Sequence, residues 1–420
     1  MDSDSFETQF SKLYANLQEQ NNDSISSLVS CSKDKKRAKK KVPTSQENEL
    51  FFKLIKTLQS NYNSKFFTPN LEKIHDVDMF VGGLSLLWIA VYSNRREAVL
   101  LLLKKGANPN KTSEKLQFPP LYVALELGFN NIVNILLNHP QIKLNACDKL
   151  GRSILMIAIA QKNMSVIDKI MTYLGTLEES AQKNIINKKN YKQDSILYLL
   201  VEFQYDKDYI QKLFEFKDKN NNLLLDINVV NMYHNTPLHA AIYTDNNEVT
   251  RLLVDNKAQL DLLNKRGLSP LHIATHKNNL NVVQLLLEKG ANVNLQDPSL
   301  RTSLHMSMEE YIGLEIIRLL LNYKIDTRIR ANFEVDGVDK SYTALMLICC
   351  CHQNLEKVDL LLEFSKKKDL EDLQAAKVIA TEESHQEIVS KIEVKIKEFE
   401  SSDLETSREE SGLYSMTVKK

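Results

Sequence analysis

Glycine and proline are scarce in this chain, with 11 and 9 residues among 420. Phosphate-binding loops need closely spaced glycines, because only glycine lets the backbone approach a phosphate group. The sequence contains no such loop, and it also lacks the zinc-protease helix, the nucleophile elbow and the protein-kinase signature. We therefore expect a protein that is not an enzyme and that uses no cofactor or metal.

An excess of one charge and a long apolar run are missing as well. The 54 basic residues equal the 54 acidic ones, so no overall field attracts nucleic acid, and we expect no nucleic-acid partner. Apolar runs such as residues 84–91 and 154–160 fall short of the roughly 18 residues that a membrane span needs, and the first 30 residues are polar, unlike a signal peptide. The five cysteines do not form a disulfide pattern, which favours a reducing, intracellular environment.

A short phrase recurs eight times along the chain. Each copy has leucine at its third position: Ser85-Leu-Leu-Trp88, Pro119-Pro-Leu-Tyr122, Ser153-Ile-Leu-Met156, Ser195-Ile-Leu-Tyr198, Thr236-Pro-Leu-His239, Ser269-Pro-Leu-His272, Thr302-Ser-Leu-His305 and Thr343-Ala-Leu-Met346. Most copies are 33 or 34 residues apart, and three steps are 41 or 42 residues long. A unit of this length cannot bury its own apolar face, so the period predicts a stack of repeats.

Residues 269–294 contain the fullest repeat. Ser269 is placed to cap a helix with its hydroxyl, and Pro270 occupies the first helical position, where its missing N–H costs nothing. Gly290 suits the left-handed end of a second helix. This unit, the one before it and residues 85–110 closely resemble ankyrin repeats. The resemblance implies an all-α ankyrin-repeat solenoid of helix-turn-helix units with hairpin fingers, about eight repeats plus a partial C-terminal cap.

The longer steps mark where the stack departs from regularity. They imply extra turns in residues 172–194 and 215–235 and a lengthened loop at 324–342. The repeats that begin at Thr302 and Thr343 also carry one added residue between their helices. We expect these segments to bend the stack or to expose a surface of their own.

Composition divides the chain into four parts. We expect residues 1–45 and 396–420 to be disordered polar tails, because neither buries enough apolar area to order itself. Residues 46–74 are expected to be capping helices, with apolar residues at helical spacing over 47–59. The ankyrin-repeat domain spans 75–395 and ends in an incomplete unit at 375–389, which serves as a cap.

Both tails carry candidate signals. Residues 33–43 hold seven basic residues and one acidic residue, a pattern typical of a nuclear import signal, an anionic-surface patch or simply a solvated tail. Near the other end, glutamates at 398, 400, 405, 409 and 410 precede a short segment that ends in Met416-Thr-Val-Lys-Lys420. This arrangement resembles the export signal of ankyrin-repeat type IV secretion effectors of intracellular bacteria such as Legionella. The alternative is an acidic tail with no such role.

The histidines and cysteines are expected to be structural. His239, His272 and His305 take the fourth position of the phrase, where the resemblance implies hydrogen bonds to neighbouring loops. Residues 349–352 read Cys-Cys-Cys-His and fall within one helix. Adjacent helical side chains point in different directions and cannot converge on one metal ion.

A candidate binding surface follows from the repeat register. In ankyrin stacks the finger tips and the ends of the first helices line a concave face. Mapping those positions gives the candidate partner-binding residues Tyr92, Phe118, Tyr191, Phe203, Tyr233, Tyr243, Lys265, Arg266, His276, Arg301 and Tyr342. Tyrosine and arginine dominate the binding energy of protein interfaces. The alternative is that some of these rings pack against neighbouring fingers.

These features predict a monomeric, non-enzymatic scaffold that binds a protein partner on its concave face. If the chain is an effector, the partner is a host protein met in the host cytoplasm or nucleus. Two alternatives stay open. One is an enzyme with its site on residues 172–194, 215–235 or 324–342. The other is a nucleus-directed binding protein that uses the basic N-terminal cluster.

Overall fold

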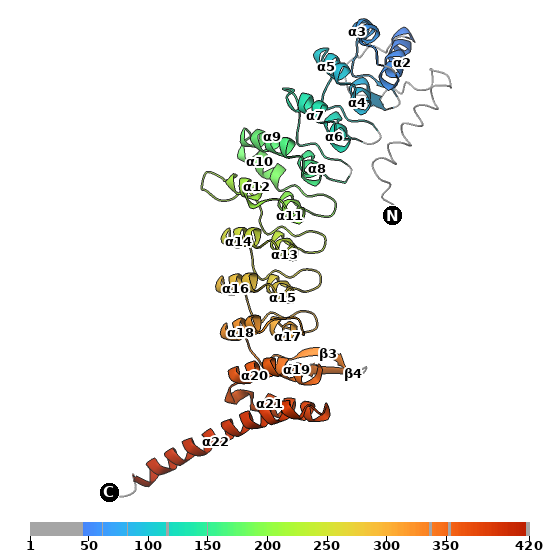
Figure 1. Ribbon diagram of the computed structural model, residues 1–420. Coiled ribbons are helices and arrows are strands. Elements are labelled where there is room, and N and C mark those ends of the chain that lie inside the picture. The colour runs from blue at the N-terminus through green and yellow to red at the C-terminus, as the bar shows by residue number, and fades with distance from the viewer. Residues whose placement is uncertain are drawn as a thin grey trace, which may run out of the picture. The chain divides into compact units, whose positions relative to one another are not determined.

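The computed structural model describes residues 45–416, apart from positions 61, 82, 115–116, 149, 336–337 and 352–353. The basic cluster at 33–43 and the last four residues lie outside this range. The described chain divides after Tyr191 into two compact units, each of them a stack of helix pairs (Figure 1). No helix in the described range has both the length and the apolar character that a membrane crossing requires.

The first unit begins with two covering helices and continues with helix pairs. Its elements are α2 (Ser45–Gln59), α3 (Ser64–Glu72), β1 (Phe80–Val81), β2 (Leu84–Ser85), α4 (Leu86–Tyr92), α5 (Arg96–Lys104), α6 (Pro120–Glu126), α7 (Asn130–Leu137), α8 (Ile154–Ala160), α9 (Met164–Gly175) and α10 (Glu179–Ile186). The helix expected over 47–59 lies within α2, which packs on α4 and buries Phe51, Leu54 and Leu58.

The second unit continues the pattern of paired helices. Its elements are α11 (Ile196–Glu202), α12 (Lys207–Gln211), η3 (Lys212–Glu215), α13 (Pro237–Tyr243), α14 (Asn247–Asp255), α15 (Pro270–His276), α16 (Leu280–Glu288), α17 (Ser303–Met306), α18 (Leu314–Asn322), β3 (Ala331–Val335), β4 (Val338–Tyr342), α19 (Ala344–Cys351), α20 (Leu355–Phe364), η4 (Lys367–Asp369), α21 (Leu370–Glu382) and α22 (Gln386–Met416). Inner helices α13, α15 and α17 contact one another in sequence, and so do outer helices α14, α16 and α18.

Local chemistry fixes where the inner helices begin. The Thr236 and Ser269 hydroxyls each accept the backbone N–H three residues ahead, at 3.3 Å in both cases. His239 and His272 complete the motif, since their Nδ1 atoms accept the backbone N–H of the capping residue. Proline fills the first helical position of both helices. The expected register of the repeats is therefore confirmed at these two helices.

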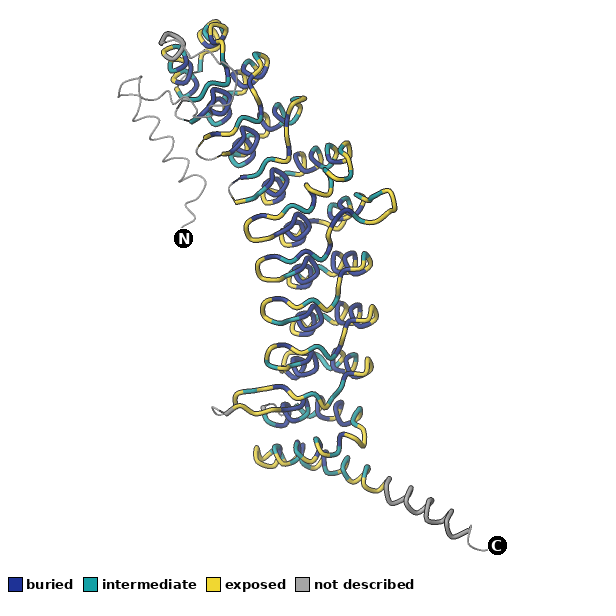
Figure 2. The backbone as a smooth tube through the Cα atoms, turned by 180° about the vertical axis from the view of Figure 1, so that it is seen from behind, coloured by how far each residue is buried: buried dark blue, intermediate teal, exposed yellow. Residues whose placement is uncertain are grey.

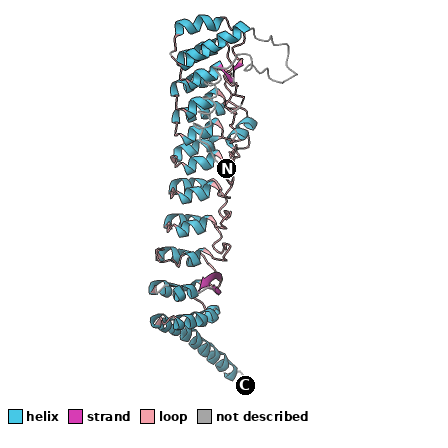
Figure 3. Cartoon of the chain, turned by 90° about the vertical axis from the view of Figure 1, so that its right-hand side faces the viewer, coloured by secondary structure: helices cyan, strands magenta, loops and turns pink. Residues whose placement is uncertain are grey.

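Burial separates the helices from the fingers that connect the repeats. The described side chains are buried along the inner helices and exposed at the finger tips (Figure 2). In each unit the fingers project on the same side of their helix pairs (Figure 3). Such fingers can present side chains that the helix packing does not need.

All three long segments contain extra structure, which was expected for the first two. Residues 172–194 include α10, and residues 215–235 include a small hairpin with a bridge between Lys217 and Leu223. Residues 324–342 form the antiparallel hairpin β3–β4, in which Ala331 pairs with Tyr342 and Val335 with Val338. We expected only a longer loop there.

The added residue before α18 accompanies a shortened inner helix. Helix α17 has a single turn, Ser303–Met306. The ammonium group of Lys357, on α20 of the next repeat, donates to the carbonyl oxygens of Ser307 (3.0 Å) and Glu309. Lys357 is 1% exposed, and burial lowers the pKa of its ammonium group. Its side chain thus replaces the hydrogen-bond donors that a longer helix would have supplied.

The C-terminal pair closes the second unit. Helices α21 and α22 pack together and bury Leu373, Ala376, Ile388 and Ile392. The segment between α20 and α21 holds only the short helix η4 and no finger. We expected order to end near residue 395, whereas α22 is helical through Met416. Lysine and glutamate favour helix formation without a core, and Lys395 pairs with Glu398 one turn later at 3.1 Å.

Candidate functional site

An asparagine or aspartate side chain holds the base of each of three fingers in the second unit. The Asn231 Oδ1 atom accepts the N–H groups of Tyr233 and Asn235. In the same way Asn264 binds the N–H groups two and four residues ahead, and so does Asp297. Such turns fix the backbone. The tip side chains are therefore presented by ordered turns.

Neighbouring fingers contact each other directly. The Lys265 N–H donates to the Tyr233 carbonyl oxygen at 2.9 Å. Gly267 has a φ of +73°, and a Cβ atom at this position would overlap the ring of Pro298 in the next finger. We call the three tips together, residues 231–235, 264–268 and 297–301, the fingertip surface.

Five of the candidate binding residues are exposed at or beside the fingertip surface. Tyr233 is 54% exposed, and Lys265 and Arg266 are exposed without an ion pair among the described residues. Tyr243, at the end of α13, is 37% exposed, and its hydroxyl accepts a hydrogen bond from the Asn264 Nδ2 atom at 3.2 Å. His276, at the end of α15, is also exposed. The structure brings Tyr243 to the base of the neighbouring finger.

Phe118 and Tyr342 differ from the prediction, because both are buried. The Phe118 ring stacks on Tyr122 with centroids 4.5 Å apart. The Tyr342 ring, at the end of β4, lies 6.5 Å from the ring of Phe333 on the paired strand β3. These rings follow the alternative in which aromatic side chains pack against neighbouring segments, and they are not available to a partner.

Of the four remaining candidates, two lie in the second unit and two in the first. Phe203 is half-buried, and Arg301 pairs with Asp297 at 2.8 Å. In the first unit, Tyr92 is half-buried and stacks 6.0 Å from Trp88, while Tyr191 is exposed.

Two exposed residues, Tyr311 and Leu300, were not among the candidates predicted from the sequence. Tyr311 lies in the loop with the added residue, and its hydroxyl is 2.7 Å from the His276 Nδ1 atom. Leu300, at the tip of the finger held by Asp297, has a φ of +60°. The signal for Leu300 was present in the sequence, because the equivalent position holds Gly267 one repeat earlier.

The structural role expected for the histidines is confirmed. The Nε2 atom of His239 lies 3.2 Å from the Leu268 carbonyl oxygen, and that of His305 lies 3.1 Å from the Tyr342 carbonyl oxygen. Burial lowers the pKa of both rings to about 4. Burial also lowers the pKa of His272. All three are neutral near pH 7, and His239 and His305 tie their inner helices to backbone of the next repeat.

The cysteine segment forms the end of helix α19. His352 lies outside the described residues. Burial raises the pKa of the Cys349 thiol to about 12, which keeps it protonated and unreactive. Among the described side chains, no group of three His, Cys, Asp or Glu residues is arranged to hold a metal ion.

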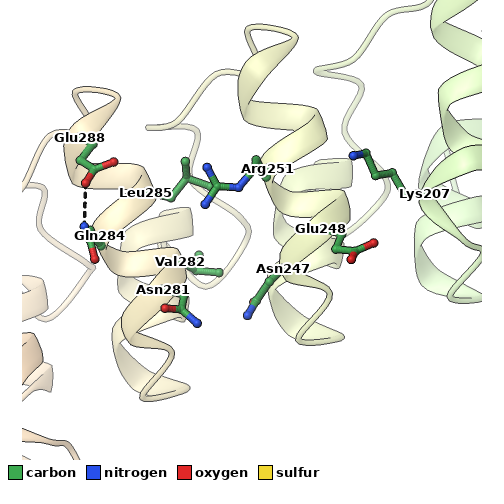
Figure 4. Close-up of a pocket in the computed structure, with 9 residues that line it drawn as sticks. All are labelled: Lys207, Asn247, Glu248, Arg251, Asn281, Val282, Gln284, Leu285 and Glu288. Atoms are coloured by element: carbon green, nitrogen blue, oxygen red, sulfur yellow. Dashed lines mark hydrogen bonds between the residues drawn. The ribbon is translucent and has the colours of Figure 1, made fainter.

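An open groove of about 570 Å³ crosses the outer helices α12, α14 and α16. Lys207, Arg251 and Glu288 line it, together with the apolar side chains of Val282 and Leu285. These side chains project side by side along the helices and do not converge on one point (Figure 4). The groove offers mixed polar contacts without a candidate nucleophile.

The chain is similar to known ankyrin-repeat proteins. A sequence model of ankyrin repeats matches residues 87–187, 195–297 and 245–331. The solved ankyrin repeat domain of Bcl-3 is similar at 22% identity and a TM-score of 0.44, covering 57% of this chain and 98% of that one.

Three curated proteins show similarity over part of the chain. The human transient receptor potential cation channel subfamily A member 1 is 27% identical over 197 residues, which are 47% of this chain and 16% of the channel protein. The putative ankyrin repeat protein FPV031 of fowlpox virus is 31% identical over 182 residues, 42% of this chain and 49% of the viral protein. The ANK repeat-containing protein nipk-1 of Caenorhabditis elegans is 30% identical over 152 residues, 36% and 21% respectively. The chain thus spans half or less of the length of these relatives.

Proposed function

The chain belongs to the ankyrin-repeat family, and on this premise we propose that it is a non-enzymatic scaffold that binds a protein partner. The binding site is the fingertip surface with the adjoining ends of α13 and α15. The observation that carries this proposal is the exposure of Tyr233 and Tyr243 beside Lys265 and Arg266, two cations that form no ion pair with any described residue. Exposed rings contribute little to folding, whereas rings buried at an interface centre dominate its energy.

A double substitution tests the proposal. Tyr233→Ala with Tyr243→Ala should shift the melting midpoint only slightly, because both rings are largely outside the core. Capture of the partner should weaken more than tenfold, since an aromatic ring buried at the centre of an interface typically contributes about 2 kcal/mol. The partner is first isolated from host-cell lysate with the intact chain, and its affinity is then measured for both proteins.

Tyr323 provides the matched control. It is 39% exposed at the end of outer helix α18, away from the fingers, so Tyr323→Ala should keep both stability and binding. A double mutant that unfolds would place Tyr233 and Tyr243 in the core. A double mutant that binds its partner fully would move the site elsewhere on the chain.

We further propose that the scaffold is a monomeric effector exported by an intracellular bacterium into the host cytoplasm, with the basic cluster at 33–43 directing it to the nucleus. The glutamates between 398 and 410 and the short C-terminal segment support this proposal. Removing residues 401–420 should stop export in a translocation reporter assay. Replacing residues 1–20 with a neutral linker is the control and should leave export unchanged. Normal export of the shortened chain would contradict the effector role.

A further inference from the structure

Leu300 adopts a backbone conformation that leucine avoids. Its φ of +60° lies in the left-handed region, where the Cβ atom of an L-residue crowds the backbone. The other non-glycine residues that the structure describes at positive φ are polar or charged, for example Asn94, Gln193 and Asp245. Leu300 is therefore the one aliphatic side chain placed in this way within the described range.

Packing within the protein does not offset this strain. The Leu300 side chain is 42% exposed at the finger tip. The equivalent turn positions in the two preceding fingers hold His234 and Gly267, so the turn itself does not require leucine. Strain that the fold does not need is characteristic of residues kept for binding.

The surroundings of Leu300 define a chemistry. Two repeats earlier, on the finger 231–235, Met232 and Tyr233 are exposed, at 40% and 54%. Between them and Leu300 lie Lys265 and Arg266, whose charges have no ion-pair partner among the described residues. The row therefore alternates apolar side chains with two exposed cations on three turns that contact each other.

We propose that Leu300 is the apolar anchor of a site for an extended acidic segment of a partner protein. This proposal rests on the scaffold function above and names the chemistry of its partner. An apolar partner side chain packs against Leu300, and the partner's carboxylates pair with Lys265 and Arg266. An extended segment fits because the three tips lie in a row. A nucleic acid would also meet the cations and could stack one base on Tyr233, but successive bases need a series of rings, and Leu300 and Met232 are not aromatic.

Peptide selection tests the proposal with a defined probe. Random peptides of about twelve residues are displayed and selected on the full-length chain. The selected peptides should be rich in Asp and Glu and carry at least one large apolar residue. The best peptide should bind Leu300→Gly and Leu300→Asn at least tenfold more weakly, since both residues suit the left-handed turn but remove the apolar anchor. Both variants should melt at the same temperature as the wild type or higher.

Two further variants separate the contribution of the Leu300 side chain from that of the two cations. Ser384→Gly changes another left-handed position, between α21 and α22 and outside the fingertip surface, and should keep the affinity of the selected peptide within about twofold. Lys265→Glu with Arg266→Glu should abolish the preference for acidic peptides while leaving the melting temperature nearly unchanged, because both cations are exposed and form no ion pair within the described part of the chain.

Several results would overturn the inference. Equal peptide affinity for wild type and Leu300→Gly, or a lower melting temperature for Leu300→Gly, would remove Leu300 as a strained anchor. Selection of no acidic peptides would do the same. The Tyr233→Ala, Tyr243→Ala double mutant then decides about the scaffold function. If this mutant no longer captures the partner, the scaffold function stands without the Leu300 anchor. If it still captures the partner, the scaffold function at this surface is rejected too. Salt-sensitive binding of an oligothymidylate that Leu300→Gly does not weaken would reassign the surface to nucleic acid.

Discussion

Thr236 shows how a single side chain sets the start of a helix. Its hydroxyl accepts the His239 N–H and its own N–H is bound by the His239 ring. Thr236→Ala should lower the free energy of unfolding by about 1 kcal/mol in urea titrations. Thr244→Ala is the control, because the Thr244 hydroxyl bonds only to carbonyls at the helix end and should matter much less. An unchanged urea midpoint for Thr236→Ala would mean that α13 does not depend on this cap.

The buried histidines make stability depend on pH. The folded pKa of His239 and of His305 is about 4, below the usual 6.5, so the unfolded chain binds protons that the folded chain does not. Their contribution is complete above pH 6.5 and is lost as the pH falls toward 4. At pH 5 each ring should reduce the free energy of unfolding by on the order of 2 kcal/mol relative to pH 7.

The pH effect is measured by comparing urea unfolding at pH 7 and pH 5 for the wild type and for His239→Gln. The glutamine variant is less stable at pH 7, but its loss between the two pH values should be smaller. An identical loss in both proteins would show that His239 takes up its proton in the folded state.

At the scale of elements, the end of helix α17 depends on a side chain from the next repeat. Its single turn is followed by carbonyl groups that the buried Lys357 ammonium binds. Lys357→Met keeps the side-chain length and removes the donor, so the carbonyls lose a charged partner. The free energy of unfolding should fall by about 2 kcal/mol or more. Lys289→Met is the matched control, since its exposed ion pair with Asp255 contributes at most about 1 kcal/mol. Equal stability of wild type and Lys357→Met would contradict this role.

The helix pairs were predictable because their signals are local. Hydroxyl caps, the proline that follows them and apolar spacing all act within one repeat, so Thr236 and Ser269 identify their helices directly. Burial of Phe118 and Tyr342 was not predictable, because it depends on how a ring meets the next segment in space. The β3–β4 hairpin was missed for the same reason. Leu300 could have been found by comparing it with Gly267, although only the structure shows that its side chain is exposed.

For the molecule as a whole, stability should reside in the contacts between successive repeats, because each repeat contacts mainly its neighbours. Removing residues 1–44 and 402–420 should leave the melting transition nearly unchanged and reduce the helical circular-dichroism signal only by the lost end of α22. A large loss of cooperativity after trimming would show that one of these ends stabilises the stack. Trimming each end separately would then identify which.

The Lys357 contact has a consequence for how this gene can change over generations. Repeat arrays gain and lose members by unequal recombination, which leaves a working protein when every unit offers its neighbour the same surface. The repeats at residues 302–342 and 343–364 do not meet that condition. The Lys357 ammonium group of the later repeat binds the carbonyl oxygens of Ser307 and Glu309, which follow the shortened helix α17 of the earlier repeat. A deletion of residues 302–342 alone would bury an unpaired charge. We expect natural variants to gain or lose these two repeats together, and to exchange the regular repeats from Thr236 and Ser269 one at a time.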